Sequence, residues 1–154
     1  MAEVVFADPI GSDFQIVSLE RLLHLIKTKK ERYWNSPSSS GNASLYYYRE
    51  RWTSEESPDA SLDFTMRNKV GFHIYYSKTL DNGTEIDCYA WTGGDFAEIV
   101  SINNAGEKSK IPRSLFVGVD QARIIITSFF KSGGRTRKVK WIGSGKVPWG
   151  RIEE

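Results

Sequence analysis

The stretch from residue 115 to residue 142 constrains the fold more than any other part of the chain. Its sequence, LFVGVDQARIIITSFFKSGGRTRKVKWI, repeats apolar side chains at the spacing of one helix face, namely at Val119, Ala122, Ile125, Ile126 and Phe129. Gly118 can act as the N-cap, and Asp120 places a carboxylate in the first turn, where the helix dipole favours it. Lys131 closes the last turn, and Gly133 and Gly134 offer a left-handed stop. The pattern predicts a core helix that ends at the glycine pair.

Alternating side chains from Arg135 to Ile142 predict a short strand after this helix. Arg137, Val139 and Trp141 share one side of the expected strand, and the other side carries Thr136, Lys138 and Lys140. We therefore expect one half-buried face and one Lys-rich outer face.

The rest of the chain indicates one more helix and a series of strands. Ser18 is a good N-cap for an amphipathic helix whose apolar face carries Leu19, Leu22, Leu23 and Ile26. Asp81-Asn82-Gly83 is the strongest hairpin signal. Pro112 favours an edge or irregular position for residues 110–116. The other expected strands are residues 3–7, 45–52, 61–66, 70–78, 85–91 and 96–102.

Strands that follow one another through short turns favour a meander packed under helices. We expect an α+β fold, with an antiparallel β-sheet meander of about six or seven strands packed against two helices. The 154 residues fit a single domain, 1–154, in which residues 143–154 form a surface strap anchored by Trp149.

Cysteine usage and hydropathy indicate a reducing compartment. Cys88 is the single cysteine and lies on the apolar side of its expected strand, which favours a buried structural thiol. The sequence shows no positively charged start followed by an apolar core, and no apolar run near the ~20 residues of a spanning helix. These features predict a cytoplasmic protein without membrane contact.

Few residues offer catalytic or metal chemistry. A zinc site needs three or four Cys or His ligands, and the sequence has one Cys and two His. His24 has no second ligand nearby and is expected to be satisfied or exposed. His73 has no Ser or Cys nucleophile elbow with it and is expected to have a structural role or no special role. Gly143-Ser144-Gly145-Lys146 lacks the Ser or Thr that must follow in a phosphate-binding loop. We expect no catalytic residue, no cofactor and no metal, and therefore not an enzyme.

A net charge of +2 hides a strong separation of charge along the chain. Residues 50–100 contain ten carboxylates against four Lys and Arg, whereas residues 101–154 contain eleven Lys and Arg against four carboxylates. Such a separation usually gives one acidic and one basic surface region.

Acidic and aromatic residues together are the candidate partner-binding site. Trp and Tyr among carboxylates are typical of a hot spot for a basic protein partner. The bland alternative is that Tyr89 and Trp91 pack under a helix while the acids are solvated. The first candidate group is Glu50, Trp52, Glu55, Glu56 and Asp59, and the second is Asp87, Tyr89, Trp91, Asp95 and Glu98.

A set of residues near the C-terminus resembles the signature of a bacterial immunity family, the first of the polymorphic-toxin immunity families. These residues are Ala122, Phe129, Phe130, Gly133, Arg135, Val139 and Trp141. Members of that family often lie beside nucleic-acid deaminase toxins. The resemblance implies a protein that binds a cognate secreted toxin and neutralises it by occluding its active site. It implies a toxin of the nucleic-acid-targeting kind, with a deaminase as one class, and a monomer or a heterodimer with the toxin.

The alternative function is a small nucleic-acid-binding module. A basic cluster near aromatic residues can bind phosphates and stack on bases, and here it comprises Lys131, Arg135, Arg137, Lys138 and Lys140. The same residues also fit a solvated helix end and an edge strand whose lysines block aggregation. The immunity hypothesis expects no direct contact with nucleic acid.

Overall fold

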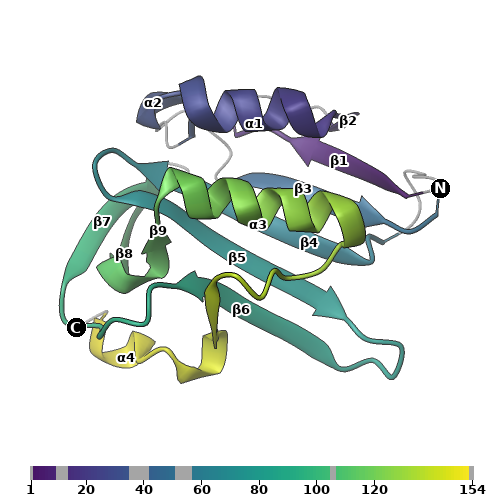
Figure 1. Cartoon of the computed structure of the whole chain (residues 1–154). Helices are drawn as coiled ribbons and strands as arrows, with labels where there is room; N and C mark the ends of the chain where they lie inside the picture. Colours follow the sequence, from purple (N-terminus) through teal and green to yellow (C-terminus); the bar gives the residue numbers. More distant parts are fainter. Residues whose placement is uncertain (1, 10–13, 35–41, 51–56, 105–106, 153–154) are drawn as a thin grey trace.

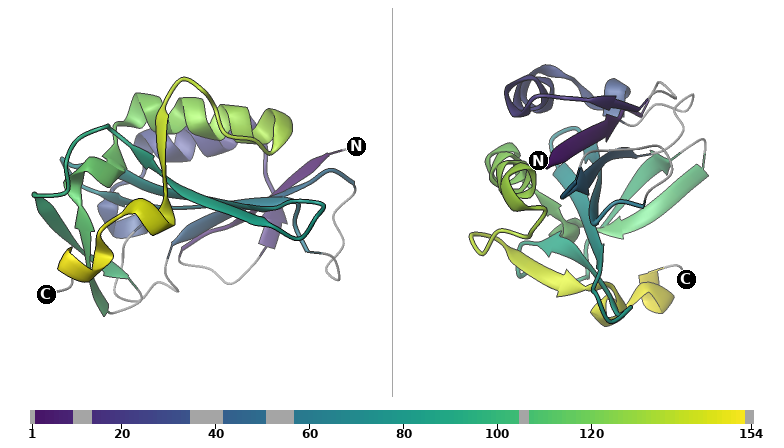
Figure 2. Two further views of the ribbon diagram at one scale, coloured as in Figure 1. Left: turned by 90° about the horizontal axis from the view of Figure 1, so that it is seen from below. Right: turned by 90° about the vertical axis from the view of Figure 1, so that its right-hand side faces the viewer.

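An antiparallel sheet forms the centre of the molecule, and helices cover one of its faces (Figures 1 and 2). The computed structural model describes residues 2–9, 14–34, 42–50, 57–104 and 107–152. The sheet contains eight strands in the order β10-β6-β5-β4-β3-β1-β2, with β9 paired to β5 outside this path. The predicted α+β class, with an antiparallel sheet of about seven strands under helices, is confirmed.

The main sheet is built from a meander with additions at both edges. The meander comprises β3 (Ala43–Tyr48), β4 (Ala60–Arg67), β5 (Gly71–Thr79) and β6 (Glu85–Trp91). Added to it are β1 (Glu3–Ala7), β2 (Phe14–Ile16), β9 (Phe116–Val117) and β10 (Lys140–Gly143). The hairpin between β5 and β6 turns at Gly83, where φ is +83°, as the Asn-Gly signal predicts.

A separate hairpin lies at one end of the sheet (Figure 1). It consists of β7 (Ile99–Asn104) and β8 (Glu107–Pro112). A 3₁₀ turn, η1 (Arg113–Leu115), then leads into β9. The central strand β5 therefore has a divided edge: Tyr75–Thr79 pairs with β6, and Phe72 and His73 pair with β9.

Two helices lie side by side over one face of the sheet (Figure 2). In α1 (Leu19–Thr28) the Ser18 hydroxyl accepts the N–H of Arg21 at 3.1 Å, which satisfies one free donor of the first turn. In α3 (Val119–Ser132) the side chain of Gln121 accepts the N–H of Gly118 at 2.8 Å. Gly133 ends α3 in the left-handed region, with φ at +69°. Both predicted helices are confirmed, and a single turn, α2 (Glu31–Trp34), follows the first.

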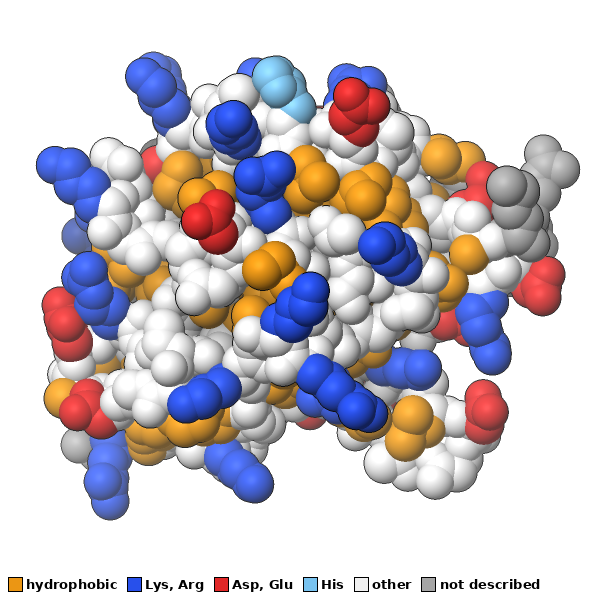
Figure 3. All heavy atoms as spheres, viewed as in Figure 1, with side chains coloured by type: hydrophobic (Ala, Val, Ile, Leu, Met, Phe, Trp, Pro, Cys, Tyr) orange, Lys and Arg blue, Asp and Glu red, His pale blue; other side chains and the backbone are white. Residues whose placement is uncertain are grey.

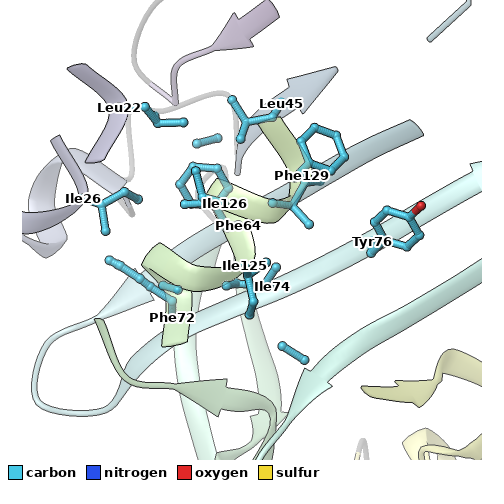
Figure 4. Close-up of a cluster of buried hydrophobic side chains, with 14 of the residues drawn as sticks. Leu22, Ile26, Leu45, Phe64, Phe72, Ile74, Tyr76, Ile125, Ile126 and Phe129 are labelled. Carbon is cyan, nitrogen blue, oxygen red and sulfur yellow. The ribbon is translucent and has the colours of Figure 1, made fainter. Parts of the chain in front are cut away.

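The larger hydrophobic core lies between these helices and the sheet (Figure 4). Side chains from α1 and α3 face alternate side chains of β3, β4 and β5. A fully buried side chain of this size contributes about 1.5–3 kcal/mol relative to its exposed form. The labelled members are Leu22, Ile26, Leu45, Phe64, Phe72, Ile74, Tyr76, Ile125, Ile126 and Phe129.

A smaller core lies on the opposite face of the sheet. On β6, Cys88 and Ala90 belong to the larger core, while Tyr89 and Trp91 point to the other side, as alternation requires. The C-terminal segment supplies η2 (Ser144–Lys146) and α4 (Trp149–Ile152). Thus the predicted surface strap is an element with its own buried side chains. The buried members are Ile102, Ile111, Leu115, Phe116, Ile142, Val147 and Ile152.

The predicted strand over residues 135–142 is wrong in length, because β10 begins at Lys140. Thr136, expected on the outer face, is buried, and its hydroxyl accepts the N–H of Lys138 at 3.1 Å. Its carbonyl accepts the indole N–H of Trp141 at 3.0 Å. These local hydrogen bonds replace the strand ladder over residues 135–139. Arg137 is exposed, whereas Val139 and Trp141 are half-buried as expected.

Three smaller expectations also need correction. Val119, expected on the buried stripe of α3, is the first residue of the helix and is 45% exposed. The strand expected at 96–102 starts at Ile99 and pairs only with β8, outside the main meander. The strand expected at 45–52 ends at Tyr48, where the backbone N–H of Arg49 donates to the Asp59 carboxylate at 2.7 Å. None of the helices in the described part of the chain is long and apolar enough to cross a membrane.

Replacing Gly133 with alanine should destabilise the fold strongly. A Cβ at this position would lie 2.5 Å from the Tyr47 ring, and the positive φ disfavours any side chain. We expect the free energy of unfolding to fall by about 3 kcal/mol, from left-handed strain plus overpacking. Urea unfolding followed by circular dichroism measures this.

The neighbouring Gly134→Ala variant is the matched control. A Cβ there would meet only the flexible Ser132 hydroxyl, at 3.1 Å. We expect a change within about 0.5 kcal/mol. Equal losses in the two variants would contradict the role assigned to Gly133.

Candidate functional site

The second candidate group lies on and beyond β6, on the face of the sheet away from α1 and α3. Asp87 and Tyr89 sit on the strand, and Trp91 ends it. Asp95 and Glu98 follow in the loop that leads to β7. The structure therefore brings the five residues onto one continuous segment, with the carboxylates at two different depths.

Asp87 is held within the molecule and does not project as a free charge. Its Oδ2 accepts hydrogen bonds from the Tyr75 hydroxyl, at 2.9 Å, and from the Ser144 hydroxyl. Burial and then this carboxylate raise the pKa of Tyr75. Asp87 thus ties β5, β6 and the C-terminal segment together.

Tyr89 is part of an aromatic cluster. Its ring stacks on His73 with centroids 5.1 Å apart, and it meets Tyr75 at 5.0 Å and Trp149 edge-on at 5.5 Å. Burial, with a further contribution from Asp87, raises the pKa of the Tyr89 hydroxyl. Tyr89 therefore packs under a helix, as the alternative to a binding role expects, but this helix is α4 and not one of the two helices over the larger core.

The loop of residues 92–98 projects from the end of β6 and is exposed except at Phe96. Trp91 and Phe96 stack almost parallel, at 7° with centroids 6.1 Å apart, and the Trp91 indole donates to the Gly94 carbonyl at 2.9 Å. Gly93 takes a φ of +90°, which favours glycine there. The aromatic pair gives the exposed loop a fixed base.

Backbone hydrogen bonds hold both ends of the same loop. The backbone N–H of Thr92 donates to the Ser114 carbonyl at 2.9 Å, and the backbone N–H of Arg113 donates to the Glu98 carbonyl at 2.8 Å. Asp95 accepts the N–H of Ala97 at 3.0 Å, and the Glu98 carboxylate pairs with Arg113 at 3.3 Å. The Asp95 and Glu98 side chains are therefore exposed on a preorganised backbone.

The structure describes only Glu50 and Asp59 of the first candidate group. Glu50 is exposed just after β3, and Trp52, Glu55 and Glu56 lie outside the described residues. Asp59 forms an ion pair with Arg49 at 3.4 Å, so its charge is partly compensated.

The sheet face beside Tyr89 also contains a polar cavity of about 610 Å³. Its lining includes Asp63, His73 and Tyr75, with the β7–β8 hairpin and Trp149 on the other side. Register explains the grouping, because Asp63 lies opposite Tyr75 on β5, and Tyr75 lies opposite Tyr89 on β6. Sequence analysis missed Asp63 as a site residue. β4 alternates apolar and polar side chains, and Asp63 falls on its polar side between Ser61 and Thr65, so the strand pattern did not set it apart.

Burial shifts the pKa values of Asp63 and His73, which both line this cavity, in opposite directions. Burial raises the pKa of Asp63, and a hydrogen bond from Ser44 partly offsets it. Burial lowers the pKa of His73 to about 4, against a smaller opposing effect of its hydrogen bond to Leu115. Both shifts disfavour the charged form, so His73 is neutral at pH 7.

The face formed by α1 and α3 is basic. In Figure 3, Lys and Arg side chains are spread over this face, with apolar side chains exposed between them. An open groove of about 710 Å³ is lined by Arg123, Lys131 and Lys138 among others, with Asp120 at its edge. Arg135 takes another direction: it lies over the Tyr76 ring at 5.5 Å, and its guanidinium donates to the Cys88 sulfur at 3.2 Å.

Chemistry at Cys88 is disfavoured by its position. The thiol is buried as predicted, and burial raises its pKa despite the nearby Arg135. Among the described residues, no group of three or more His, Cys, Asp or Glu side chains is placed to hold a metal ion. His24 is exposed on α1.

Comparisons with known proteins add no relative: a scan against family models, a search of curated proteins and a search of solved structures each found no match.

His73 should make the fold sensitive to acid. A His pKa lowered from about 6.5 to about 4 gives stability that is complete above pH 6.5 and is lost as the pH falls toward 4. We expect this loss to be about 3 kcal/mol in the free energy of unfolding between pH 7 and pH 4. Urea unfolding at several pH values measures it.

Two variants isolate the contribution of His73. His73→Phe keeps an aromatic ring beside Tyr89 but cannot titrate, so its stability should depend less on pH, although it is lower at pH 7. His24→Gln, on exposed α1, should keep the wild-type dependence. If His73→Phe and wild type show the same slope, the buried histidine is not the acid-sensitive group.

Proposed function

We propose that this chain is a non-catalytic immunity protein, which binds a cognate secreted bacterial toxin and occludes its active site. The contact surface is the loop of residues 92–98, with the Asp95 and Glu98 carboxylates facing a basic surface of the toxin. Enzymes that act on nucleic acid carry positive charge where the phosphates bind, so an acidic loop is complementary to them.

The observation that carries this proposal is the combination of exposure and rigidity in the loop. The stacked Trp91–Phe96 pair and the hydrogen bonds at both ends fix the backbone before any partner arrives. A preorganised loop loses little conformational entropy on binding, and this favours tight inhibition. The exposed carboxylates of Asp95, within the loop, and Glu98, at its end, would also increase the rate of association with a basic partner.

The residues that resemble the immunity family support the proposal through the scaffold. Ala122 and Phe129 are buried in the larger core, Gly133 ends α3, and Val139 and Trp141 pack against that core. Shared scaffold residues leave the exposed loops to determine the partner. The interface is accordingly placed outside this set.

Coexpression with the neighbouring gene tests the proposal directly. The product of the gene immediately upstream should be toxic in its C-terminal domain, and this chain should rescue growth and coelute with that domain. A harmless neighbour, or a toxic one that is neither rescued nor bound, would remove the immunity function.

Neutral variants of the loop test the interface. Asp95→Asn and Glu98→Gln together remove both charges and retain hydrogen-bond acceptors for Ala97 and Arg113. We expect toxin affinity to fall about tenfold, mainly through slower association, with a weaker dependence on salt. Surface plasmon resonance at two salt concentrations measures both rates.

The matched control neutralises two exposed carboxylates at the other end of β6, Asp81→Asn with Glu85→Gln. This pair has the same change of charge, so it controls for the net electrostatic effect. An equal loss of affinity in both double variants would show that the loop has no special place in the interface.

A second candidate function is nucleic-acid binding by the basic face. The groove beside α3 favours it, because Lys138 and the helix residues Arg123 and Lys131 line one concave surface. Arg137 and Lys140 are exposed near it in sequence. Phosphate contacts of this kind depend strongly on salt.

Changing Arg137, Lys138 and Lys140 together to Gln tests this second candidate. If the basic face binds nucleic acid, fluorescence anisotropy should detect labelled oligonucleotides at low salt, and the triple variant should bind more weakly with a smaller salt slope. The absence of binding by the wild-type chain at low salt would remove this function.

A further inference from the structure

The cavity beside Tyr89 has the size of a ligand site and a chemistry of its own. Its volume of about 610 Å³ falls within the range of small-molecule sites, roughly 300–1,000 Å³. Strands β4, β5 and β6 supply one side of its lining, and the β7–β8 hairpin and Trp149 supply the other. The loop of residues 92–98 takes no part in it.

The register of the sheet places a carboxylate beside aromatic rings. Asp63 lies opposite Tyr75, and Tyr75 lies opposite Tyr89, so these three side chains share one face of the sheet. The Tyr75 and Tyr89 rings are 5.0 Å apart between centroids, and Trp149 meets Tyr89 edge-on at 5.5 Å. The faces of such rings attract cations, as a carboxylate does. The two features together favour an organic cation.

Asp63 is costly to the fold, and no cation among the described residues offsets this cost. Burial raises the pKa of Asp63, so the site disfavours the ionised carboxylate. Its Oδ1 accepts a hydrogen bond from the Ser44 hydroxyl at 2.7 Å, and none of the ion pairs in the described part of the chain includes Asp63. A bound cation would lower the cost, because an opposite charge nearby favours the ionised form.

The charges that act on the cavity lining are negative. Burial raises the pKa of Tyr75, and the hydrogen bond to Asp87 and the charges of Asp87 and Asp63 raise it further. Burial and then Asp87 raise the pKa of Tyr89 in the same way. A ligand with positive charge is therefore attracted to this face of the sheet, and an anion is repelled.

The lysines of β8 leave this field in place. Alternation along β8 turns Ser109 and Ile111 toward the core, and it turns Lys108 and Lys110 away from the cavity. Both lysines are exposed, so solvent and salt screen their charges. The β8 side chain that faces the cavity beside Ile111 is thus a neutral serine.

His73 adds a hydrogen-bond acceptor to the lining. Its Nδ1 lies 3.2 Å from the Leu115 carbonyl, and a carbonyl can only accept, so Nδ1 carries the proton. In the neutral ring Nε2 is then an unprotonated acceptor. The Tyr75 hydroxyl already donates to Asp87. A ligand that suits Asp63 and His73 therefore brings its own N–H donors.

We propose that this cavity binds a guanidinium group. Two of its N–H groups donate to the Asp63 carboxylate, its plane lies against the aromatic rings, and His73 offers an acceptor for a further N–H. A guanidinium matches a carboxylate with two parallel hydrogen bonds and stacks on rings, whereas an ammonium does neither. A free guanidino compound and an arginine side chain of a protein share this chemistry. The proposal does not rest on the immunity function.

Nuclear magnetic resonance titration with agmatine at low salt tests the proposal. We expect a dissociation constant of about 1 mM for the wild-type chain, with amide shifts centred on β4, β5 and β6. N-carbamoylputrescine has the same shape with a neutral urea in place of the guanidinium, and putrescine has an ammonium there. Both should bind at least about tenfold more weakly, because the charge or the paired hydrogen bonds are lost.

A capped Gly-Arg-Gly peptide separates the two sources of the group. Binding at least as tight as that of agmatine assigns the cavity to an arginine of a protein chain. Weaker binding than that of agmatine assigns it to a free guanidino compound.

Removing the charge of Asp63 tests its role. Asp63→Asn keeps an oxygen acceptor for Ser44 and should weaken agmatine binding at least about tenfold. Asp120→Asn is the matched control: it makes the same change at an exposed position of α3, on the other face of the sheet, and should bind as wild type does. Circular dichroism confirms that each variant is folded.

Adding a positive charge tests the cavity without changing Asp63. Ser109→Lys introduces an ammonium on the side of β8 that faces the cavity and should weaken binding at least about tenfold. The control is Ser101→Lys, at an exposed position of β7 in the same hairpin, which should bind as wild type does.

Several outcomes would overturn the proposal. They are no amide shifts at about 10 mM agmatine, equal affinity for N-carbamoylputrescine or putrescine, and unchanged affinity in Asp63→Asn and Ser109→Lys. None of them bears on toxin binding, because the toxin test uses the carboxylates of residues 95 and 98.

Discussion

The alternation of side chains along β5 is the constraint on which both the larger core and the polar face of the sheet depend. Ile74 and Tyr76 point into the larger core, while His73 and Tyr75 point to the polar side of the sheet. A slip of one residue in register would bury the polar set under α3 and expose the apolar set. The strand is held against this from both edges, by β4 on one side and by β6 and β9 on the other. Tyr76 adds a tie to the helix layer, since its hydroxyl donates to the Gly133 carbonyl at 2.9 Å.

Periodicity in the sequence predicted the parts of the fold where one face is apolar over several turns or residues. The helix with Ile125, Ile126 and Phe129 on one side and the strand over residues 85–91 fall in this class. Prediction failed where side chains bind the backbone locally. Residues 135–139 alternate as a strand would, yet Thr136 and Trp141 form hydrogen bonds that hold an irregular segment. Pattern alone does not distinguish these two outcomes.

The sequence was enough to predict the exposed loop of residues 92–98 as a candidate site, but not the cavity lined by Asp63 and His73. Asp95 and Glu98 are close in sequence, so a turn after a strand was enough to place them together. Asp63, His73 and Ser109 come from three separate strands, and only the register of the sheet and the position of the β7–β8 hairpin bring them together. Long-range pairing of this kind leaves no local signal. Asp63 occupies the polar side of an alternating strand, where a carboxylate is unremarkable until its neighbours are known.

The shape of the loop at residues 92–98 is encoded mainly by atoms other than its carboxylates. Its base is the Trp91–Phe96 stack, and its ends are fixed by backbone bonds to Arg113 and Ser114. Asp95, Ala97 and Glu98 contribute exposed side chains, which can therefore be exchanged at small cost to the fold. Such a division allows rapid divergence: one ancestral scaffold can acquire new specificities by substitutions at a few surface positions, while the same core keeps every descendant folded.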